Sequence, residues 1–378
     1  MSMRWRIAVG LSLLVMMSLA PCAAHAATAD VRATYPFLTH GMAANPVLPH
    51  VYATMPTSNA VAVIDTRTLQ QIATVPVGAL PRGLAVSPDG SRVYVGNGGE
   101  NTVSVIDAAT LTTLPKLDIP FQAANVAVGQ GNRIYVSPYP EQFNTTNLAQ
   151  VDVVTNTATQ IAAPSYAKDA VLHVNPDRTR LYVANRGLSP SALARFDISG
   201  GATPTLLSPT HSGWGGDIGM THDGAYLAVE HSIIGQGTGY GKVRTSDMTI
   251  VGFFPNGDFS TGIAFAPDDT IAYTTHMTNE IEMWDVATTA SLGELTIPAL
   301  PSTMALDRMV LDATGQTLFV AGRIGGSNWN VWAVAVPEPA GALMWMFAAA
   351  IALERHRRTA GVCRFGCAEH SAQPNLHG

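Results

Sequence analysis

The stretch Gly83-Leu-Ala-Val-Ser-Pro-Asp-Gly90, followed by Arg92-Val-Tyr-Val-Gly-Asn97 and Thr102-Val-Ser-Val-Ile-Asp107, decides the fold. Each run alternates apolar and polar residues in the manner of half-buried strands, and Pro-Asp-Gly is typical of a hairpin turn. The same phrase recurs along the chain. Its aromatic marker stands at Tyr52, Tyr94, Tyr135, Tyr182, Tyr226, Tyr273 and Phe319. Its final aspartate stands at Asp65, Asp107, Asp152, Asp197, Asp247 and Asp285, with Ala333 at this place in the seventh copy.

Successive markers are 41 to 47 residues apart. A period of about 40–50 residues built from short strands is the signature of propeller blades. One four-stranded blade cannot bury both of its faces, whereas a closed ring of blades can. The sequence therefore predicts an all-β, seven-bladed β-propeller over residues 27–336. The last copy runs into Pro337 without a fourth strand, so we expect Asp30–Tyr35 to supply its outer strand.

Tyr94-Val-Gly-Asn97 with Thr102-Val-Ser-Val-Ile-Asp107 resembles the YVTN-type β-propeller repeat, with Gly96 where the family often has Thr. Tyr52-Ala-Thr-Met55 and Tyr182-Val-Ala-Asn185 are similar to it, while the third, fifth and seventh copies have drifted. The resemblance covers most of residues 48–336 and implies a surface or secreted protein. Related seven-bladed folds include lactonases and periplasmic electron-transfer subunits, so the fold alone does not give the function.

The first 26 residues have the pattern of a signal peptide. Arg4 and Arg6 precede an apolar run of 13 residues, Ile7 to Leu19, which is too short for a typical spanning helix. Ala24-His25-Ala26 is a small-x-small cleavage site, so the mature chain is expected to begin at Ala27. An alternative lipoprotein start at Cys22 is disfavoured by Pro21.

The other end of the chain has the pattern of a sorting signal. Pro337-Glu338-Pro339 precedes an apolar run, residues 340–353, and then the basic residues Arg355, Arg357 and Arg358. This order resembles the PEP-CTERM signal of exosortase systems in Gram-negative bacteria, often found with exopolysaccharide production. It implies an exosortase-like sorting protease as a partner. It also implies transient inner-membrane anchoring of a protein destined for the periplasm, the outer surface or the medium.

On this interpretation residues 337–358 form a sorting segment with a short transmembrane helix, and residues 359–378 form a disordered tail. Glu354 and the twenty residues after Arg358 depart from the family pattern. The tail contains Cys363 and Cys367, which could also be interpreted as a metal or redox pair. The alternative for the apolar run is a final helix packed on the propeller.

Composition excludes several classes of function. Residues 27–336 carry 15 basic and 24 acidic residues, a net charge of −9, so nothing favours binding to nucleic-acid phosphates. The same range contains no cysteine, which removes thiol nucleophiles and cysteine-based zinc or haem sites. No hydrolase elbow, zinc-protease motif or phosphate loop is present, and the glycine-rich Gly235–Gly241 run is interpreted as a flexible loop.

Polar residues expected in the loops at one end of the central channel form the candidate ligand site. The candidate set is Arg82, Lys168, Trp214, Asp217, His231, Asp258, His276, Arg308 and Arg323. The same loops also carry Asn97, Asn125, Asp169, Arg186, His211, Glu230 and Asp307. The alternative is that these are ordinary loop residues. Trp214 offers a stacking surface, whereas Trp284 and Trp332 are expected in the core.

His231 and His276 each directly follow an aromatic strand in the repeat alignment. With Glu230, Asp217 or Asp258 they could form a metal site, or they could be hydrogen-bonded rim residues. We predict no metal and no cofactor, and no catalytic residue is assigned.

The leading hypothesis is a non-enzymatic surface protein that binds a ligand in an exopolysaccharide or envelope context. The alternatives are a hydrolase of the seven-bladed lactonase type, with its site at the channel mouth, and a purely structural matrix component.

Overall fold

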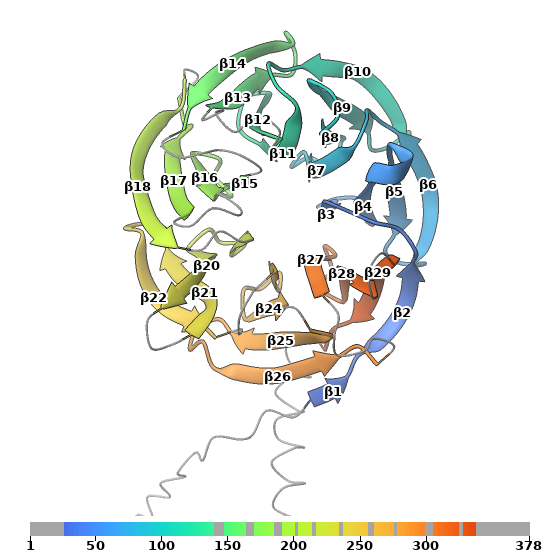
Figure 1. Ribbon diagram of the computed structural model, residues 1–378, viewed down its shortest axis with the longest axis vertical. Coiled ribbons are helices and arrows are strands. Elements are labelled where there is room, and N and C mark those ends of the chain that lie inside the picture. Colours follow the sequence, from blue (N-terminus) through green and yellow to red (C-terminus); the bar gives the residue numbers. More distant parts are fainter. Residues whose placement is uncertain are drawn as a thin grey trace, which may run out of the picture.

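The structure is a computed structural model. It describes residues 26–139, 147–163, 170–184, 191–200, 203–213, 217–233, 237–255, 261–275, 278–298, 305–324 and 328–337. Within them the chain forms seven sheets arranged as the blades of a ring, and four strands of each sheet are antiparallel (Figure 1). The fold expected from the repeat is confirmed.

The blades follow the order of the chain. Blade 1 has β3 (Met42–Ala44), β4 (His50–Met55), β5 (Ala60–Asp65) and β6 (Gln70–Pro76), with a 3-10 turn at Pro56–Ser58; blade 2 has β7 (Pro81–Val86), β8 (Arg92–Asn97), β9 (Thr102–Asp107) and β10 (Thr112–Asp118). Blade 3 has β11 (Ala123–Val128), β12 (Arg133–Pro138), β13 (Asn147–Asp152) and β14 (Thr157–Ala162); blade 4 has β15 (Val171–Val174), β16 (Arg180–Ala184), β17 (Ser191–Asp197) and β18 (Thr205–Gly213).

The second half of the ring contains both ends of the described chain. Blade 5 has β19 (Ile218–Met220), β20 (Tyr226–Ile233), β21 (Gly237–Arg244) and β22 (Thr249–Phe254). Blade 6 has β23 (Gly262–Phe265), β24 (Ile271–Thr275), β25 (Glu280–Asp285) and β26 (Ser291–Thr296), with β1 (Ala26–Thr28) added outside β26. Blade 7 has β27 (Ala305–Leu311), β28 (Thr317–Ile324) and β29 (Asn328–Ala335), with β2 (Asp30–Tyr35) as its outer strand.

The ring closes as predicted, with Asp30–Tyr35 as the outer strand of the last blade. β2 pairs with β29 in antiparallel register, with Tyr35 opposite Val331 and Asp30 opposite Ala335. A strand from the start of the chain and the last strand of the propeller are therefore held in one sheet. Figure 1 shows β2 at the rim beside the red strands of blade 7. The pairing of β1 with blade 6 was not predicted.

The core lies between adjacent blades rather than within one sheet. The second strand of most blades places an aromatic side chain against the following blade: Tyr52, Tyr94, Tyr135, Tyr182, Tyr273 and Phe319 are all buried. Trp284 and Trp332 are also buried, at 5% and 2% exposure, as expected of core residues.

Blade 5 corrects the repeat alignment by two residues. Gly219 of the inner strand pairs with Ala228, just as Ala85 pairs with Tyr94 in blade 2. Ala228 therefore occupies the marker position, and Tyr226 was wrongly assigned to it. The reason is that the aromatic side chain has moved: the fully buried Tyr240, from β21, packs with Ala228 between blades 5 and 6.

The assignment of the strand-end aspartates is corrected in blades 5 and 7. Five of them end the third strand of their blade, but in blade 5 the strand ends at Arg244 and Asp247 lies in the following turn. In blade 7 the corresponding residue is Ala335, opposite Thr317, rather than Ala333. The Gly235–Gly241 run is also corrected, because Gly237 to Gly241 belong to β21 and only residues 234–236 lie outside the description.

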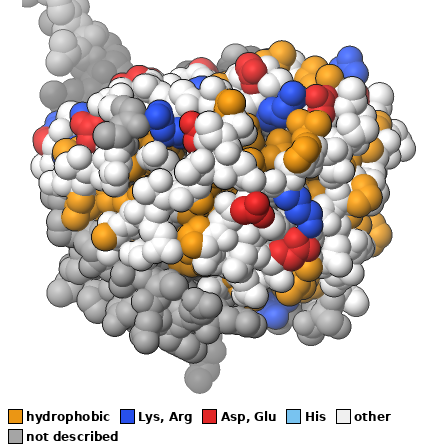
Figure 2. Space-filling view, turned by 90° about the horizontal axis from the view of Figure 1, so that it is seen from above, with side chains coloured by type: hydrophobic (Ala, Val, Ile, Leu, Met, Phe, Trp, Pro, Cys, Tyr) orange, Lys and Arg blue, Asp and Glu red, His pale blue; other side chains and the backbone are white. Residues whose placement is uncertain are grey.

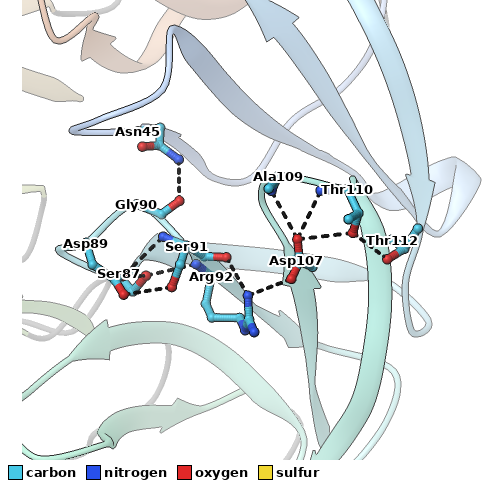
Figure 3. A network of polar contacts seen from close by, with 10 residues as sticks. All are labelled: Asn45, Ser87, Asp89, Gly90, Ser91, Arg92, Asp107, Ala109, Thr110 and Thr112. Atoms are coloured by element: carbon cyan, nitrogen blue, oxygen red, sulfur yellow. Dashed lines mark hydrogen bonds and ion pairs between the residues drawn. The ribbon is translucent and has the colours of Figure 1, made fainter.

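Tight turns connect the first strand to the second and the third to the fourth on one side of the ring, which we call the turn face. Figure 3 shows them in blade 2. Ser87 donates to Asp89 at 2.5 Å, Gly90 adopts a φ of 69°, and Asn45 of blade 1 donates to the Gly90 carbonyl at 2.9 Å. These turns have the predicted Pro-Asp-Gly chemistry, and they also join neighbouring blades.

Candidate functional site

The opposite side of the ring, where the inner strands begin, is called the loop face. Of the predicted site residues, Arg82, Asp217, Arg308 and Arg323 are described here, and the structure adds Tyr139. The inner strands of blades 1 to 3 approach one another closely here. A Cβ atom on Gly41 would lie 2.6 Å from the Arg82 carbonyl oxygen, and one on Gly83 would lie 2.3 Å from Asn125 Oδ1. Only glycine allows this approach, which fixes the backbone on both sides of Arg82.

Arg82 presents a positioned cation on the loop face. Its guanidinium carbon lies 4.2 Å from the centre of the Tyr139 ring, which follows the second strand of blade 3. Its aliphatic stem lies against Gly98, where an added Cβ would be 2.7 Å from Arg82 Cδ. Both Arg82 and Tyr139 are half-buried. A guanidinium stacked on an aromatic ring loses little further freedom on binding, so this pair can hold a planar or anionic group.

Asn97 and Asn125 have structural roles rather than the expected ligand-binding ones. Asn97 is fully buried and donates to Thr102 Oγ1 at 2.8 Å and to Ser104 Oγ at 3.0 Å. Asn125 Nδ2 donates to the Ala170 carbonyl of blade 4 at 3.1 Å. These amides hold the connecting segments in place, and they were assigned to the site because their position in the repeat was known but their partners were not.

The structure adds a residue that sequence reasoning missed. His173 stands on the inner strand of blade 4 opposite Tyr182, where other blades carry Ala85, Ala127 or Ala264. Burial lowers the pKa of His173, and the negative charge of Asp217, just before β19, opposes that shift. Alignment of the inner strands would have revealed this histidine as an exception. His173 and Asp217 stand on neighbouring blades, 4 and 5, near enough for the carboxylate charge to act on the imidazole.

The two arginines predicted for blade 7 lie at its loop-face end. Arg308 is half-buried in β27 and pairs across the sheet with Ala321. Arg323 is exposed near the end of β28, opposite Ala305. The description therefore brings Arg82, Asp217, Arg308 and Arg323 to one face of the ring. On the side of the molecule seen in Figure 2, acidic and basic side chains are interspersed rather than segregated.

Several predicted residues fall outside the description. Lys168, Trp214, Asp258 and His276 are among them, as are Glu338, Pro339, Arg355, Arg357 and Arg358. His231 was expected to follow its strand but lies within β20, and its side chain is not described. Pro337 follows β29 as predicted. Ala26 and Ala27, on either side of the expected signal cleavage, both lie in β1.

Within the described ranges, no three His, Cys, Asp or Glu side chains gather closely enough to hold a metal ion. The proposed His231–His276 site is not covered by that statement. Nor does any helix in the described part of the chain have the length and apolar character needed to cross a bilayer. The expected transmembrane segment, residues 340–353, lies outside it.

Comparison with known proteins supports the fold but identifies no family or activity. No known family's sequence pattern matches the chain, and no curated protein matches it. Among solved structures, it is similar to a chain of hydrazine synthase from Kuenenia stuttgartiensis, with a TM-score of 0.60, 15% identity, and coverage of 76% of this chain and 93% of that one. The chain is a seven-bladed β-propeller.

This architecture is too widely used to select an activity. Matches extend to 1691 chains of solved structures, and the identity to hydrazine synthase is far too low to carry residue roles from one protein to the other. The function of this propeller must therefore be argued from its own loop face.

Proposed function

We propose that this protein is an exported β-propeller whose loop face binds a polar ligand without changing it chemically. The observation that carries the proposal is the Arg82–Tyr139 stack, a cation and a ring held together by two adjacent blades. Arg308, Arg323 and Asp217 lie on the same face. Hydroxyl-rich and carboxylate-bearing sugars suit such a surface, because the ring stacks on the sugar and the guanidinium donates hydrogen bonds to its oxygens.

The binding test uses defined oligosaccharides, one neutral set of oligoglucose and one acidic set of oligogalacturonate, titrated calorimetrically. Arg82→Ala should weaken binding about tenfold or more, because a hydrogen bond from a charged group contributes about 1.5–3 kcal/mol. Tyr139→Ala should weaken it too, because it removes the ring that holds the guanidinium in place. Arg67→Ala removes a cation paired with Asp65 in blade 1 and serves as the matched control. If Arg67→Ala weakens binding as much as Arg82→Ala, non-specific attraction accounts for the result.

A hydrolase of the lactonase type is the second candidate, supported by the position of His173 on the inner strand of blade 4, within reach of the Asp217 charge. A neutral histidine near a carboxylate can act as a general base. Lactone or ester turnover by the parent protein that is lost in His173→Gln, or in the double variant His231→Ala with His276→Ala, would replace the binding function. The binding proposal expects no turnover from any of these proteins.

The localisation of the protein is proposed from the sequences at its two ends. The signal peptide supports export, and the order of Pro337-Glu338-Pro339, apolar run and basic cluster supports transient anchoring in the inner membrane and release by an exosortase-like protease. Truncation from residue 337 onwards should leave the propeller folded and release it without processing. Equal partition of full-length and truncated chains between membrane and medium would contradict the sorting proposal.

A further inference from the structure

The first ten described residues span two blades. β1 pairs in parallel with β26 of blade 6, and β2 pairs with β29 of blade 7. Between them, the Ala29 nitrogen donates to the Thr296 carbonyl at 2.8 Å, and the Ala29 side chain is buried in the apolar cluster between these blades. β1 is therefore the outermost strand of blade 6, held by backbone bonds and by one apolar face.

The other face of this sheet carries three neighbouring carboxylates, Glu280, Glu282 and Glu294. Glu282 of β25 lies directly opposite Glu294 of β26, and Glu294 pairs with Ala26 of β1. Like charges opposite each other destabilise a sheet. Burial raises the pKa of Glu282 to about 7, with Glu294 and Glu280 adding to the effect, and burial followed by Glu280 raises the pKa of Glu294. Within the described part of the chain, these three carboxylates are assigned no ion pair.

The ladder geometry directs one backbone nitrogen of β1 towards the main chain of Glu294. In a parallel pair, the N–H groups that point at the neighbouring strand recur every second residue. Because Ala29 donates to the Thr296 carbonyl, the Ala27 nitrogen is directed towards the carbonyl of Glu294. Ala27 is also the residue at which the mature chain is expected to begin.

We propose that hydrolysis of the Ala26–Ala27 bond completes blade 6, because the α-ammonium it creates docks at Glu294 and supplies a cation to the carboxylate group. The reaction adds water across the peptide bond, leaving a carboxylate on Ala26 and an amine on Ala27 that takes up a proton. Before cleavage the same nitrogen is an uncharged amide; afterwards it donates a stronger, charge-assisted hydrogen bond. The inference rests on the signal-peptide part of the proposed function.

The same geometry sets the order of events. Ala26 and Ala27 both belong to β1, so the scissile bond lies in a paired strand once the ring has closed. Peptidases take their substrates as accessible, extended chain, which paired backbone does not offer. Cleavage therefore precedes the docking of β1. The α-ammonium of Ala27 is already present when β1 pairs with β26.

Other charged groups near this edge come from two directions. Asp30 and Arg32 follow in β2 and pair with each other at 3.4 Å. On blade 5, Glu230 and Tyr240 pair across the sheet on the side that packs against blade 6, and Lys242 lies on that same side. The Lys242 ammonium donates to the Val286 carbonyl, just beyond the last residue of β25. Its charge therefore lies at the end of β25 that is opposite to Glu280.

The experiment measures the α-amino pKa of chains that begin at Ala27, prepared by removing a tag with a protease that leaves this residue first. The amine is labelled by ¹³C-dimethylation, which preserves its charge, and is titrated by NMR. An α-amino group ordinarily has a pKa of about 7.7–8.0. We expect a value above this range in the parent chain and a return to the range in Glu294→Gln.

Asp30→Asn is the matched control, because it removes a nearby but exposed carboxylate and should leave the raised value unchanged. As a second readout, the free-amine chain should melt about 1–3 °C above its Nα-acetylated form, which keeps the N–H but not the charge. An ordinary pKa in the parent chain, or equal effects of Glu294→Gln and Asp30→Asn, would overturn the proposal. N-terminal sequencing of exported protein tests the cleavage site separately, so a different natural start is distinguishable from a failed electrostatic contact.

Discussion

Between blades 2 and 3, Tyr94 packs among valine and isoleucine side chains, whereas between blades 5 and 6 its counterpart is Ala228 and the aromatic side chain comes from Tyr240. The two interfaces also differ in charge. The second contains the buried Lys242, which lies 4.2 Å from the Tyr226 ring, and the half-buried Glu282. Both interfaces close the same ring, so the fold requires an aromatic side chain between blades but accepts it from either of two strands.

The turn-face ends of the same two blades show a similar exchange. In blade 2, Arg92 at the start of the second strand pairs with Asp107 at the end of the third, at 2.7 Å. In blade 5, Tyr226 and Arg244 occupy these positions, and Arg244 pairs at 2.7 Å with Asp247 in the turn. Blade 5 therefore keeps an ion pair at this corner, with the cation at the strand end and the acid in the turn.

The largest expected effect tests the exchange of aromatic side chains. Tyr240→Ala should lower the free energy of unfolding by about 3–5 kcal/mol, as loss of a large core side chain does, and Tyr94→Ala should cost a similar amount. Ala228→Tyr alone should also destabilise, because the space is already filled. Denaturant unfolding of the double variant Ala228→Tyr with Tyr240→Ala decides the comparison. Recovery of part of the loss is expected, and additive losses would show that the two positions do not share one space.

The exchange also shows what could be predicted from the sequence. Blade number, the turn chemistry and closure by β2 were predictable, because they depend on the period, on Pro-Asp-Gly and on an unpaired run. The register of blade 5 could not be predicted, because Tyr226 lies two positions before the true marker position, Ala228, and matches the marker in residue type. For the loop face, the repeat indicated the end of blade 2 at which Arg82 lies, although Arg82 belongs to strand β7 rather than to a loop. Its stacking on Tyr139 depends on a contact between blades that no single repeat contains.

The second prediction concerns the pH dependence of the two interfaces. The pKa of Glu282 is raised to about 7, so the folded protein binds this proton more tightly than the unfolded chain does. The stability that results is present below the unfolded value, about 4.5, and is lost as the pH rises through about 7. Glu282→Gln should remove this loss, making the variant more stable than the parent at pH 8 by on the order of 2 kcal/mol.

Glu100 of blade 2 provides the opposite case for this measurement. Its hydrogen bond with Lys116 is the main reason that its pKa is lowered, so its contribution is present above the unfolded value and lost as the pH falls through the folded one. Glu100→Gln should therefore reduce stability at neutral pH and have little effect in acid. Urea midpoints between pH 4 and 8 test both variants, and parallel curves for Glu282→Gln and the parent would contradict the assigned environment of Glu282.

The smallest expected effect tests the strand-end aspartate. Asp107 accepts hydrogen bonds from the backbone nitrogens of Ala109 and Thr110, at 3.1 and 3.0 Å, and its pKa is lowered chiefly by the bond from Thr110. Asp107→Ala should cost about 1 kcal/mol, the usual net contribution of such bonds. Arg244→Ala in blade 5 should change stability less, because that pair is exposed and the turn keeps the Asp247 bond to the Thr249 nitrogen. The discriminating variant is Asp107→Asn, which keeps an oxygen acceptor for the turn but loses the charge that faces Arg92. If Asp107→Asn retains most of the stability, the turn is the main role of this aspartate and the ion pair is secondary, which explains why blade 5 could exchange the charges without losing the blade.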